Sequence, residues 1–199
     1  MEPSFSELVR NTEGLQPWRR AFHASNGTIL VLLFRTGAFQ DHTLLLALAA
    51  LLVGLLLLDM ARLAVPEVNR VFFRHFSLLA SPRETTRLAS STWYLMGILL
   101  TLILFPREAA LGGILVLALA DPSASFAGQR WGRKKVGAGT MEGSLVFAVV
   151  AFGALSFWAP WPQALGAALV TATVEALPWP VDDNFSVPLA AAGALLLLS

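Results

Sequence analysis

The chain lacks cysteine entirely, and charged residues make up only 14% of its 199 residues. Without cysteine, it has no disulfide, no zinc–thiolate site and no thiol nucleophile. The formal net charge of +1 argues against a nucleic-acid-binding protein, because such proteins carry a large basic excess. Apolar residues account for 56% of the chain, which leaves too little polar surface to cover a soluble domain. We therefore expect an integral membrane protein.

Long apolar runs alternate with charged or proline-containing stretches along the sequence. A helix that crosses a bilayer needs roughly twenty apolar residues, and on this criterion the sequence predicts about seven transmembrane spans. The predicted fold is an all-α, polytopic membrane helical bundle forming one catalytic domain over residues 1–199. The spans are expected at residues 18–34, 43–63, 88–105, 108–126, 142–158, 161–177 and 185–198.

Two segments lie outside these runs. Residues 1–16 are polar and mixed in charge, which predicts a short cytoplasmic arm. Residues 66–87 place apolar side chains at helical spacing with arginines between them, a pattern typical of an amphipathic helix in the membrane interface. Anchoring is the simplest role for this helix, and a substrate gate at the membrane surface is the alternative.

Basic residues are concentrated in the N-terminal arm and in the second and fourth connections, which an alternating path places on one side. The opposite side has Arg35 and Arg107. Because positively charged connections stay in the cytoplasm, we expect the N-terminus there and the C-terminus outside. No internal repeat is visible, so an inverted-repeat transporter is not suggested.

A carboxylate inside an apolar run is the first candidate for chemistry. Asp121 follows a Leu-rich stretch, where a buried charge is costly unless it is paired or metal-bound. Pro122 is expected to disturb the helix at this point. A glycine-rich basic loop follows, which alone is a topology signal, but a carboxylate followed by cations is what nucleotide phosphoryl chemistry requires. The residues of this loop are Gly128, Gly132, Arg133, Lys134 and Lys135.

Two further clusters lie near predicted helix starts. Glu142, Gly143 and Ser144 open the fifth span, where exposed backbone N–H groups favour a phosphate; a favourable first-turn charge is the simpler explanation of the glutamate. Glu175 ends the sixth span and Asp182-Asp-Asn184 follows in the next connection. Such oxygen ligands suit magnesium, while a solvated turn is the alternative.

Two smaller features involve arginine. His23 lies one helical turn from Arg19 and Arg20, so the imidazole is a candidate phosphate ligand or base, or an interfacial residue with no such role. Asp59 lies one turn before Arg62, which predicts a local ion pair.

These motifs, taken together and in order, resemble the CTP-dependent polyprenol and lipid kinases, a family that includes dolichol kinases, phytol kinases and the yeast-type diacylglycerol kinase that uses CTP. The family often has Gly-Asp where this chain has Ala120-Asp121, and Thr-Gly where it has Ala89-Ser90-Ser91. The matching segments are Trp18-Arg-Arg-Ala-Phe-His23, Pro82-Arg-Glu84 with Ser90 to Gly97, Asp121-Pro-Ser-Ala with the basic loop, Thr140-Met-Glu-Gly-Ser144, Glu175 and Asp182-Asp-Asn-Phe-Ser-Val-Pro-Leu189.

The resemblance implies a kinase that transfers the terminal phosphoryl group of CTP to a lipid alcohol, either diacylglycerol or an isoprenoid alcohol such as dolichol, undecaprenol or phytol. On this reading Mg²⁺ is held by Asp121, Asp182, Asp183 and Asn184. The catalytic carboxylates are Asp121, Glu175 and Asp183. The nucleotide phosphates contact Arg20, His23, Gly128, Gly132, Arg133, Lys134, Lys135, Glu142, Gly143 and Ser144.

Two other classes remain open on the sequence. A small ion or solute transporter would line its path with Asp121 and Glu175, since intramembrane carboxylates serve that purpose as well. A CDP-diacylglycerol-synthase-like cytidylyltransferase would release pyrophosphate, but the His-Gly-Gly signature of that family is absent.

Overall fold

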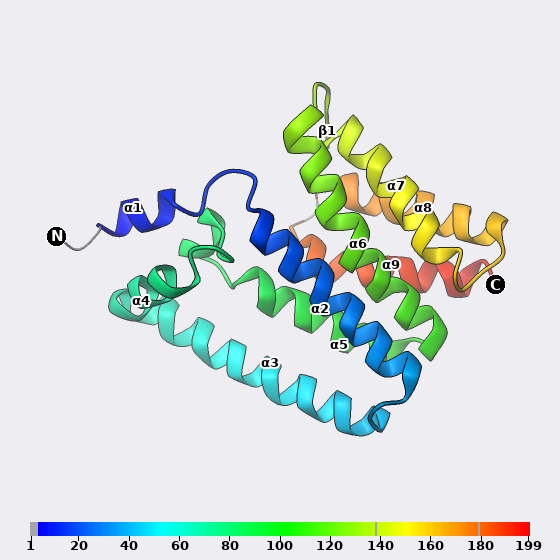
Figure 1. Cartoon of the computed structure of the whole chain (residues 1–199), viewed down its shortest axis with the longest axis horizontal. Helices are drawn as coiled ribbons and strands as arrows, with labels where there is room; N and C mark the ends of the chain where they lie inside the picture. The colour runs from blue at the N-terminus through cyan, green and yellow to red at the C-terminus, as the bar shows by residue number, and fades with distance from the viewer. Residues whose placement is uncertain (1–3, 138, 179) are drawn as a thin grey trace.

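The computed structural model describes residues 4–137, 139–178 and 180–199, and these are almost entirely helical (Figure 1). The predicted all-α class is confirmed, with one addition, a small antiparallel hairpin of two strands. The elements are α1 Phe5–Arg10, α2 Pro17–Thr36, α3 Asp41–Ala64, α4 Pro66–Phe76, the 3₁₀ helix η1 Pro82–Thr85, α5 Ser90–Leu104, α6 Arg107–Trp131, β1 Lys135–Val136, β2 Gly139–Thr140, α7 Met141–Leu155, α8 Trp161–Ala176 and α9 Asp183–Leu197.

Each of the seven predicted spans coincides with one helix, namely α2, α3 and α5 to α9. Within the described residues, α3 and α6 are long and apolar enough to cross a membrane, while α5, α7 and α9 are shorter apolar helices. Membrane insertion is therefore supported for two helices. Crossing by all seven stays a prediction.

Helix α6 is the centre of the bundle. Every residue from 110 to 118 is buried, and the helix packs against α2, α5, α7 and α9 (Figure 1). Small residues permit this close packing. A Cβ added to Gly113 would collide with the carbonyl oxygen of Pro188 on α9 and lie 3.2 Å from the Cβ of Ala192. The distance between α6 and α9 is thus set by backbone contact.

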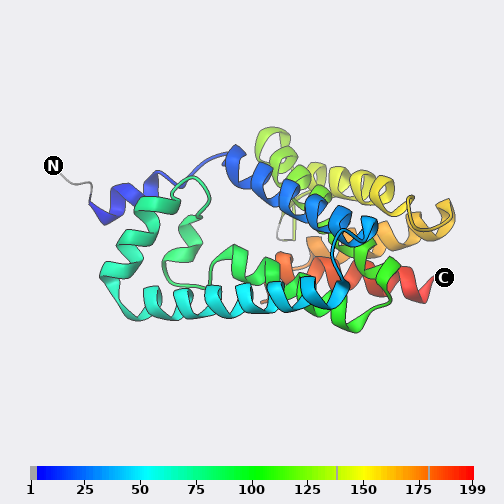
Figure 2. The same cartoon turned by 60° about the horizontal axis from the view of Figure 1, so that its bottom comes forward.

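Helix α3 occupies the edge of the molecule, where it runs along one side of the bundle (Figure 2). It packs against α4 and α5, yet most of its apolar side chains are exposed, with Leu46 at 68% and Leu57 at 61%. A continuous exposed apolar surface of this kind marks contact with lipid or a partner. Its 24-residue length matches a bilayer crossing.

The segment predicted as one interfacial helix over 66–87 is interrupted, so that prediction was wrong in its extent. Helix α4 ends at Phe76, and a turn leads to the short helix η1, which begins at Pro82. Proline restricts the residue before it to extended conformations, and Ser81 accordingly has φ −121° and ψ 151° and caps η1 with its side chain.

The predicted N-terminal arm contains helix α1, which packs onto α4. Leu8 of α1 and Phe73 of α4 are buried in one apolar cluster with Ala80. A capping box formed by Ser4 and Glu7 starts the helix. Residues 1–3 of the arm lie outside the described part of the chain.

Helix α6 also differs from the sequence prediction at its C-terminal end. Pro122 was expected to disturb the helix, yet α6 continues through it to Trp131. Proline removes one backbone hydrogen bond, and the burial of Ala120, Pro122 and Ala124 gives packing that holds the helix together. Gly128 is consequently helical and does not belong to a loop.

We predict that Gly113→Ala lowers the thermal stability of the purified protein, because the added methyl group must push α9 away from α6. Overpacking of this kind costs about 1–3 kcal/mol. Thermal unfolding in detergent, followed by circular dichroism, measures the effect.

Gly54→Ala is the matched control, because a Cβ there meets no atom within 4 Å. Alanine is favoured over glycine in a helix by about 1 kcal/mol, so this variant should unfold at the same temperature as the wild type or higher. An equal loss in both variants would contradict the packing role of Gly113.

Candidate functional site

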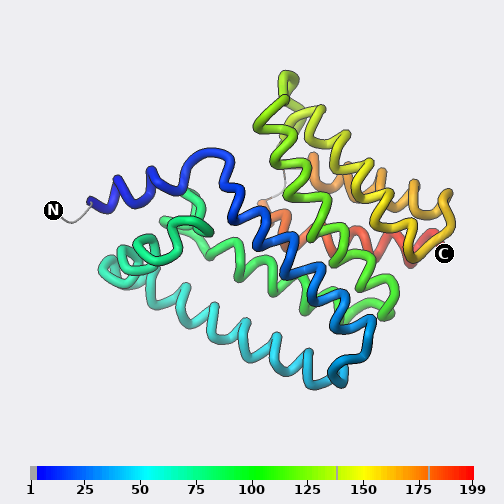
Figure 3. Tube along the Cα trace, in the orientation of Figure 1, coloured from blue at the N-terminus to red at the C-terminus, as the bar shows by residue number. Residues whose placement is uncertain are grey.

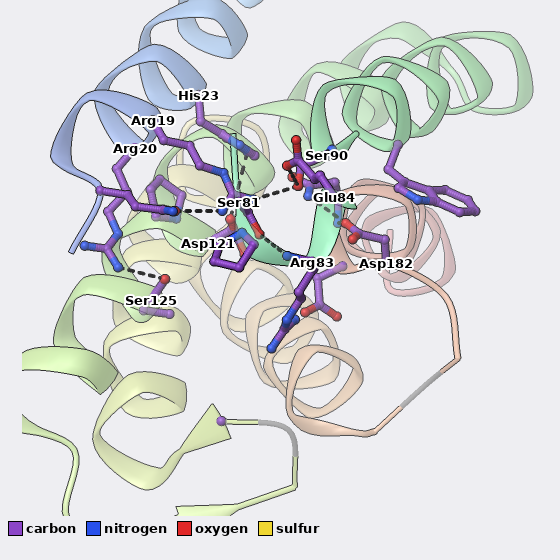
Figure 4. A pocket seen from close by; sticks show the side chains of 18 of the residues that line it. Arg19, Arg20, His23, Ser81, Arg83, Glu84, Ser90, Asp121, Ser125 and Asp182 are labelled. Atoms are coloured by element: carbon purple, nitrogen blue, oxygen red, sulfur yellow. Dashed lines mark hydrogen bonds and ion pairs between the residues drawn. The ribbon is translucent and has the colours of Figure 1, made fainter. Parts of the chain in front are cut away.

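Six helix ends meet at one end of the bundle. They are the N-terminal ends of α2, α5, α7 and α9 and the C-terminal ends of α6 and α8, with the β1–β2 hairpin projecting beside them (Figure 3). Residues from these ends and from η1 line a cavity of about 1360 Å³. Figure 4 shows polar side chains from several of these elements pointing into it.

The acidic residues predicted for the site lie together in this cavity. Asp121 comes from α6, Glu175 from the end of α8, and Asp182, Asp183 and Asn184 from the start of α9. Asp182 is the N-cap of α9, and its Oδ1 accepts hydrogen bonds from the backbone N–H of Asn184 at 3.0 Å and from its side-chain amide at 2.6 Å. The α9 helix start thus holds two acidic side chains toward Asp121.

The carboxylates are close enough to influence one another. Burial, together with the charges of Asp121 and Asp182, raises the pKa of Asp183 to about 7, although Arg83 opposes the shift. A neutral acid is the ordinary response when several carboxyl groups share a confined space. A cation bound among them would restore the ionised form.

Basic side chains from α2 and β1 line the same cavity. Arg19 and Arg20 come from the first turn of α2 and Lys135 from β1. Arg19 donates a hydrogen bond to Ser90 Oγ at 2.7 Å, and Arg20 donates one to Ser125 Oγ at 3.0 Å (Figure 4). These contacts hold both guanidinium groups at the cavity wall.

His23 lies deeper, next to Asp121. Its Nε2 is 4.0 Å from Asp121 Oδ2 and is buried without a hydrogen-bond partner among the described residues. The imidazole packs edge-to-face against Tyr94, with ring centroids 4.2 Å apart, and the Tyr94 hydroxyl donates to the His23 carbonyl at 3.1 Å. A close approach of α2 to α5 and α6 at Gly27 makes this arrangement possible.

Two predicted phosphate-binding glycines have a packing contact that the sequence did not reveal. An added Cβ at Gly128 or at Gly132 would lie 2.9 Å from Thr140 Oγ1. The same hydroxyl accepts a hydrogen bond from the Gly143 N–H at 3.2 Å, which caps α7. The glycines therefore let the hairpin and the start of α7 approach α6, and Gly128 and Gly143 still line the cavity.

Five of the predicted residues do not line the cavity. Glu142 accepts a hydrogen bond from the Arg133 backbone N–H at 3.1 Å, which fastens the hairpin to the start of α7. Ser144 donates to the Glu175 carboxylate at 3.4 Å. The five residues that do not line the cavity are Gly132, Arg133, Lys134, Glu142 and Ser144.

Several cavity residues were not among the predicted site residues, and they include Arg83, Glu84, Arg87 and Ser90. Glu84 is buried and accepts hydrogen bonds from the Ser90 hydroxyl at 2.8 Å and from its backbone N–H at 3.3 Å. Burial raises the pKa of Glu84, while Ser90 and Arg19 lower it. The family resemblance at Pro82-Arg-Glu84 and from Ser90 to Gly97 was a signal for Arg83, Glu84 and Ser90, whereas Arg87 had none.

Several oxygen atoms in the cavity suit a hard cation. Among the described residues no three His, Cys, Asp or Glu side chains form a ready metal cluster. However, Asp121, Asp182 and Asp183 line one cavity, and the Asn184 Oδ1 beside them is buried without a partner in the described part of the chain. This set fits Mg²⁺, which usually takes one or two carboxylates and completes its shell with water and substrate phosphates.

Comparison with known proteins gives three fungal relatives, each named CTP-dependent diacylglycerol kinase 1. The one from Schizosaccharomyces pombe is 25% identical over 201 residues, covering 90% of this chain and 92% of the relative. The one from Saccharomyces cerevisiae is 26% identical over 114 residues, covering 57% and 39%. The one from Eremothecium gossypii is 30% identical over 115 residues, covering 57% and 36%.

The matched region thus spans less than half of two of these relatives and nearly all of the third. No protein-family profile and no solved structure matches the chain. The names of these relatives agree with the family that the order of the motifs led us to expect.

Proposed function

We propose that the protein is a membrane enzyme that transfers the terminal phosphoryl group of CTP to the hydroxyl of a lipid alcohol. One observation carries the proposal: a single cavity brings together Asp121, Asp183, Lys135 and the arginines of α2. The relatives named CTP-dependent diacylglycerol kinase support the donor and the acceptor class. Phosphoryl transfer needs mostly positioning and charge neutralisation, which this set of side chains provides.

In the proposed reaction the oxygen of the lipid hydroxyl attacks the γ-phosphorus of CTP. The bond between that phosphorus and the β,γ-bridging oxygen breaks, and CDP leaves. The hydroxyl proton passes to a carboxylate, for which Glu175 and Asp183 are the candidates in the cavity. Arg19, Arg20 and Lys135 neutralise the negative charge on the phosphates.

Mg²⁺ bound by the oxygen atoms of Asp121, Asp182, Asp183 and Asn184 would neutralise phosphate charge and fix the phosphates for attack. Asp182 also caps α9. The N-terminal ends of α7 and α9 point to the same cavity, and such helix ends favour anions.

We place this cavity at the cytoplasmic face of a multi-pass bundle. The basic residues of α2, η1 and the hairpin lie at the cavity end. At the other end of α6 the charges are paired, Arg35 with Glu108 at 2.7 Å and Arg107 with Asp41 at 3.0 Å. This asymmetry is the one expected when the cavity end faces the cytoplasm.

Diacylglycerol is the acceptor that the names of the relatives favour, and isoprenoid alcohols are the second acceptors to test. In both, the hydroxyl lies at the water boundary while the tail stays in lipid. Incubation of the purified protein with CTP, Mg²⁺ and each alcohol, followed by mass spectrometry, tests the proposal. A phosphorylated lipid with CDP supports it, whereas a CDP-lipid with pyrophosphate, or no lipid product, contradicts it.

Asp121→Asn should abolish the transfer, because an amide of the same shape carries no negative charge. We expect a loss of at least about 10³-fold in kcat, the scale of removing a central electrostatic group. The assay above measures it, with expression and thermal unfolding as controls for folding. Near-normal turnover in this variant would refute the role of Asp121.

Lys135→Gln should raise the KM for CTP about tenfold through loss of one phosphate contact. Arg130→Gln is the matched control, since Arg130 is exposed on the last turn of α6 and does not line the cavity. It should leave the KM for CTP unchanged. Similar effects of the two substitutions would mean that overall positive charge, and not the position of Lys135, attracts the nucleotide.

The raised pKa of Asp183, about 7, predicts a pH-dependent metal requirement. Below this pKa the side chain is protonated and must lose its proton before it binds Mg²⁺. The Mg²⁺ concentration for half-maximal activity should therefore fall about tenfold between about pH 6 and about pH 8. Asp183→Asn should reduce this dependence, and a requirement that is constant with pH in the wild type would argue against Asp183 as a ligand.

A further inference from the structure

The buried pair Asp59–Arg62 near the end of α3 makes more contacts than a local ion pair needs. Arg62 Nε donates to Asp59 Oδ1, and the two residues are only 1% and 2% exposed. The guanidinium group also lies over the ring of Phe72 on α4, 4.7 Å from its centroid. A buried ion pair seldom stabilises a fold more than apolar side chains of the same size would.

The remaining donors and acceptors of the pair bind one segment of the backbone. Arg62 donates to the carbonyl oxygens of Glu84 and Arg87, the latter at 2.6 Å. Asp59 Oδ2 accepts from the backbone N–H of Ala89 at 3.0 Å and from the Thr92 hydroxyl at 2.6 Å. The pair therefore holds residues 84–89 at both ends.

Asn69 of α4 completes the arrangement. Its side-chain amide donates to the carbonyl oxygen of Thr85 at 3.0 Å, and its Oδ1 accepts from Arg62 at 3.4 Å. Most of this segment lies between η1 and α5 and has no regular secondary structure, so side chains of α3 and α4 supply much of its hydrogen bonding.

The segment and its two flanking residues carry side chains that line the cavity. Arg83, Glu84, Arg87 and Ser90 all line the cavity. Ser90 links Glu84 to Arg19 of α2 through hydrogen bonds of 2.8 Å and 2.7 Å. A shift of residues 84–89 would therefore move Arg87 and the adjacent Arg83. It would also disturb the hydrogen bond between Ser90 and Arg19.

We propose that Asp59 and Arg62 are positioning residues that fix Arg83, Arg87 and the Glu84–Ser90–Arg19 chain for binding the nucleotide phosphates. Neither residue lines the cavity, and both act through the backbone of residues 84–89. The inference rests on the proposed function. It adds to the site the arginine side chains that Asp59 and Arg62 of α3 hold in position.

The double variant Asp59→Leu with Arg62→Met separates positioning from stability, because both charges leave together and apolar side chains of similar size remain. It should unfold near the wild-type temperature. Deuterium uptake should rise in peptides covering residues 82–90 and stay unchanged in peptides from the middle of α6. The KM for CTP should rise about tenfold or more, since small misplacements of binding groups are costly, while the KM for the lipid alcohol stays within about twofold.

Arg62→Lys is the second variant, and it decides the question if the double variant fails to fold. Lysine keeps the charge pair with Asp59 but lacks the forked donors that reach two carbonyl oxygens. It should give the same selective rise in the KM for CTP and the same local gain in deuterium uptake. Arg35→Gln, which breaks the exposed ion pair with Glu108, is the control and should change none of these quantities.

Product formation, the KM for CTP and deuterium exchange together distinguish failure of the proposed function from failure of the positioning role. Wild-type protein that makes no phosphorylated lipid overturns the proposed function, while the exchange measurement still tests whether the pair holds residues 84–89. Active wild-type protein with folded variants whose KM for CTP is unchanged overturns the positioning role. Unchanged exchange at residues 82–90 overturns it as well.

Discussion

Helix α6 is buried against several neighbours and at the same time carries Asp121, and the rest of the structure depends on how these two requirements are reconciled. An ionised carboxylate in an apolar environment has a high free energy unless a nearby charge or hydrogen bond compensates it. The chain places Asp121 beyond the fully buried stretch of residues 110–118, where the helix ends of the bundle converge. A polar cavity therefore begins where the core ends.

The two substrates of the proposed reaction occupy different media. A nucleotide is restricted to water, and a lipid alcohol is restricted to the bilayer, so a common site must lie at the boundary between them. Helix ends provide such a boundary, since their free N–H groups and flanking loops are polar while the helix bodies are apolar. Asp183 illustrates this arrangement, because it lies in the first turn of the apolar helix α9.

The helices could be predicted from the sequence because apolar runs of sufficient length leave little other choice, and the observed α2 and α3 begin and end within two residues of the predicted limits. The family resemblance placed Asp121, Lys135 and Asp183 in one site, and all three line the same cavity. The end of α4 at Phe76 was missed because the apolar spacing continues to Leu79. The contribution of Arg87 could not be predicted, since its place depends on hydrogen bonds from a distant helix.

Several helix crossings in this bundle are set by backbone contact at glycine. At Gly97 an added Cβ would lie 2.9 Å from the Cα of Phe185 and would also strike the Asn184 carbonyl, so α5 touches the start of α9 directly. The spacing of such helices is insensitive to the identity of the side chains that face lipid. Lipid-facing positions are then free to vary while the glycine contacts keep the cavity in shape.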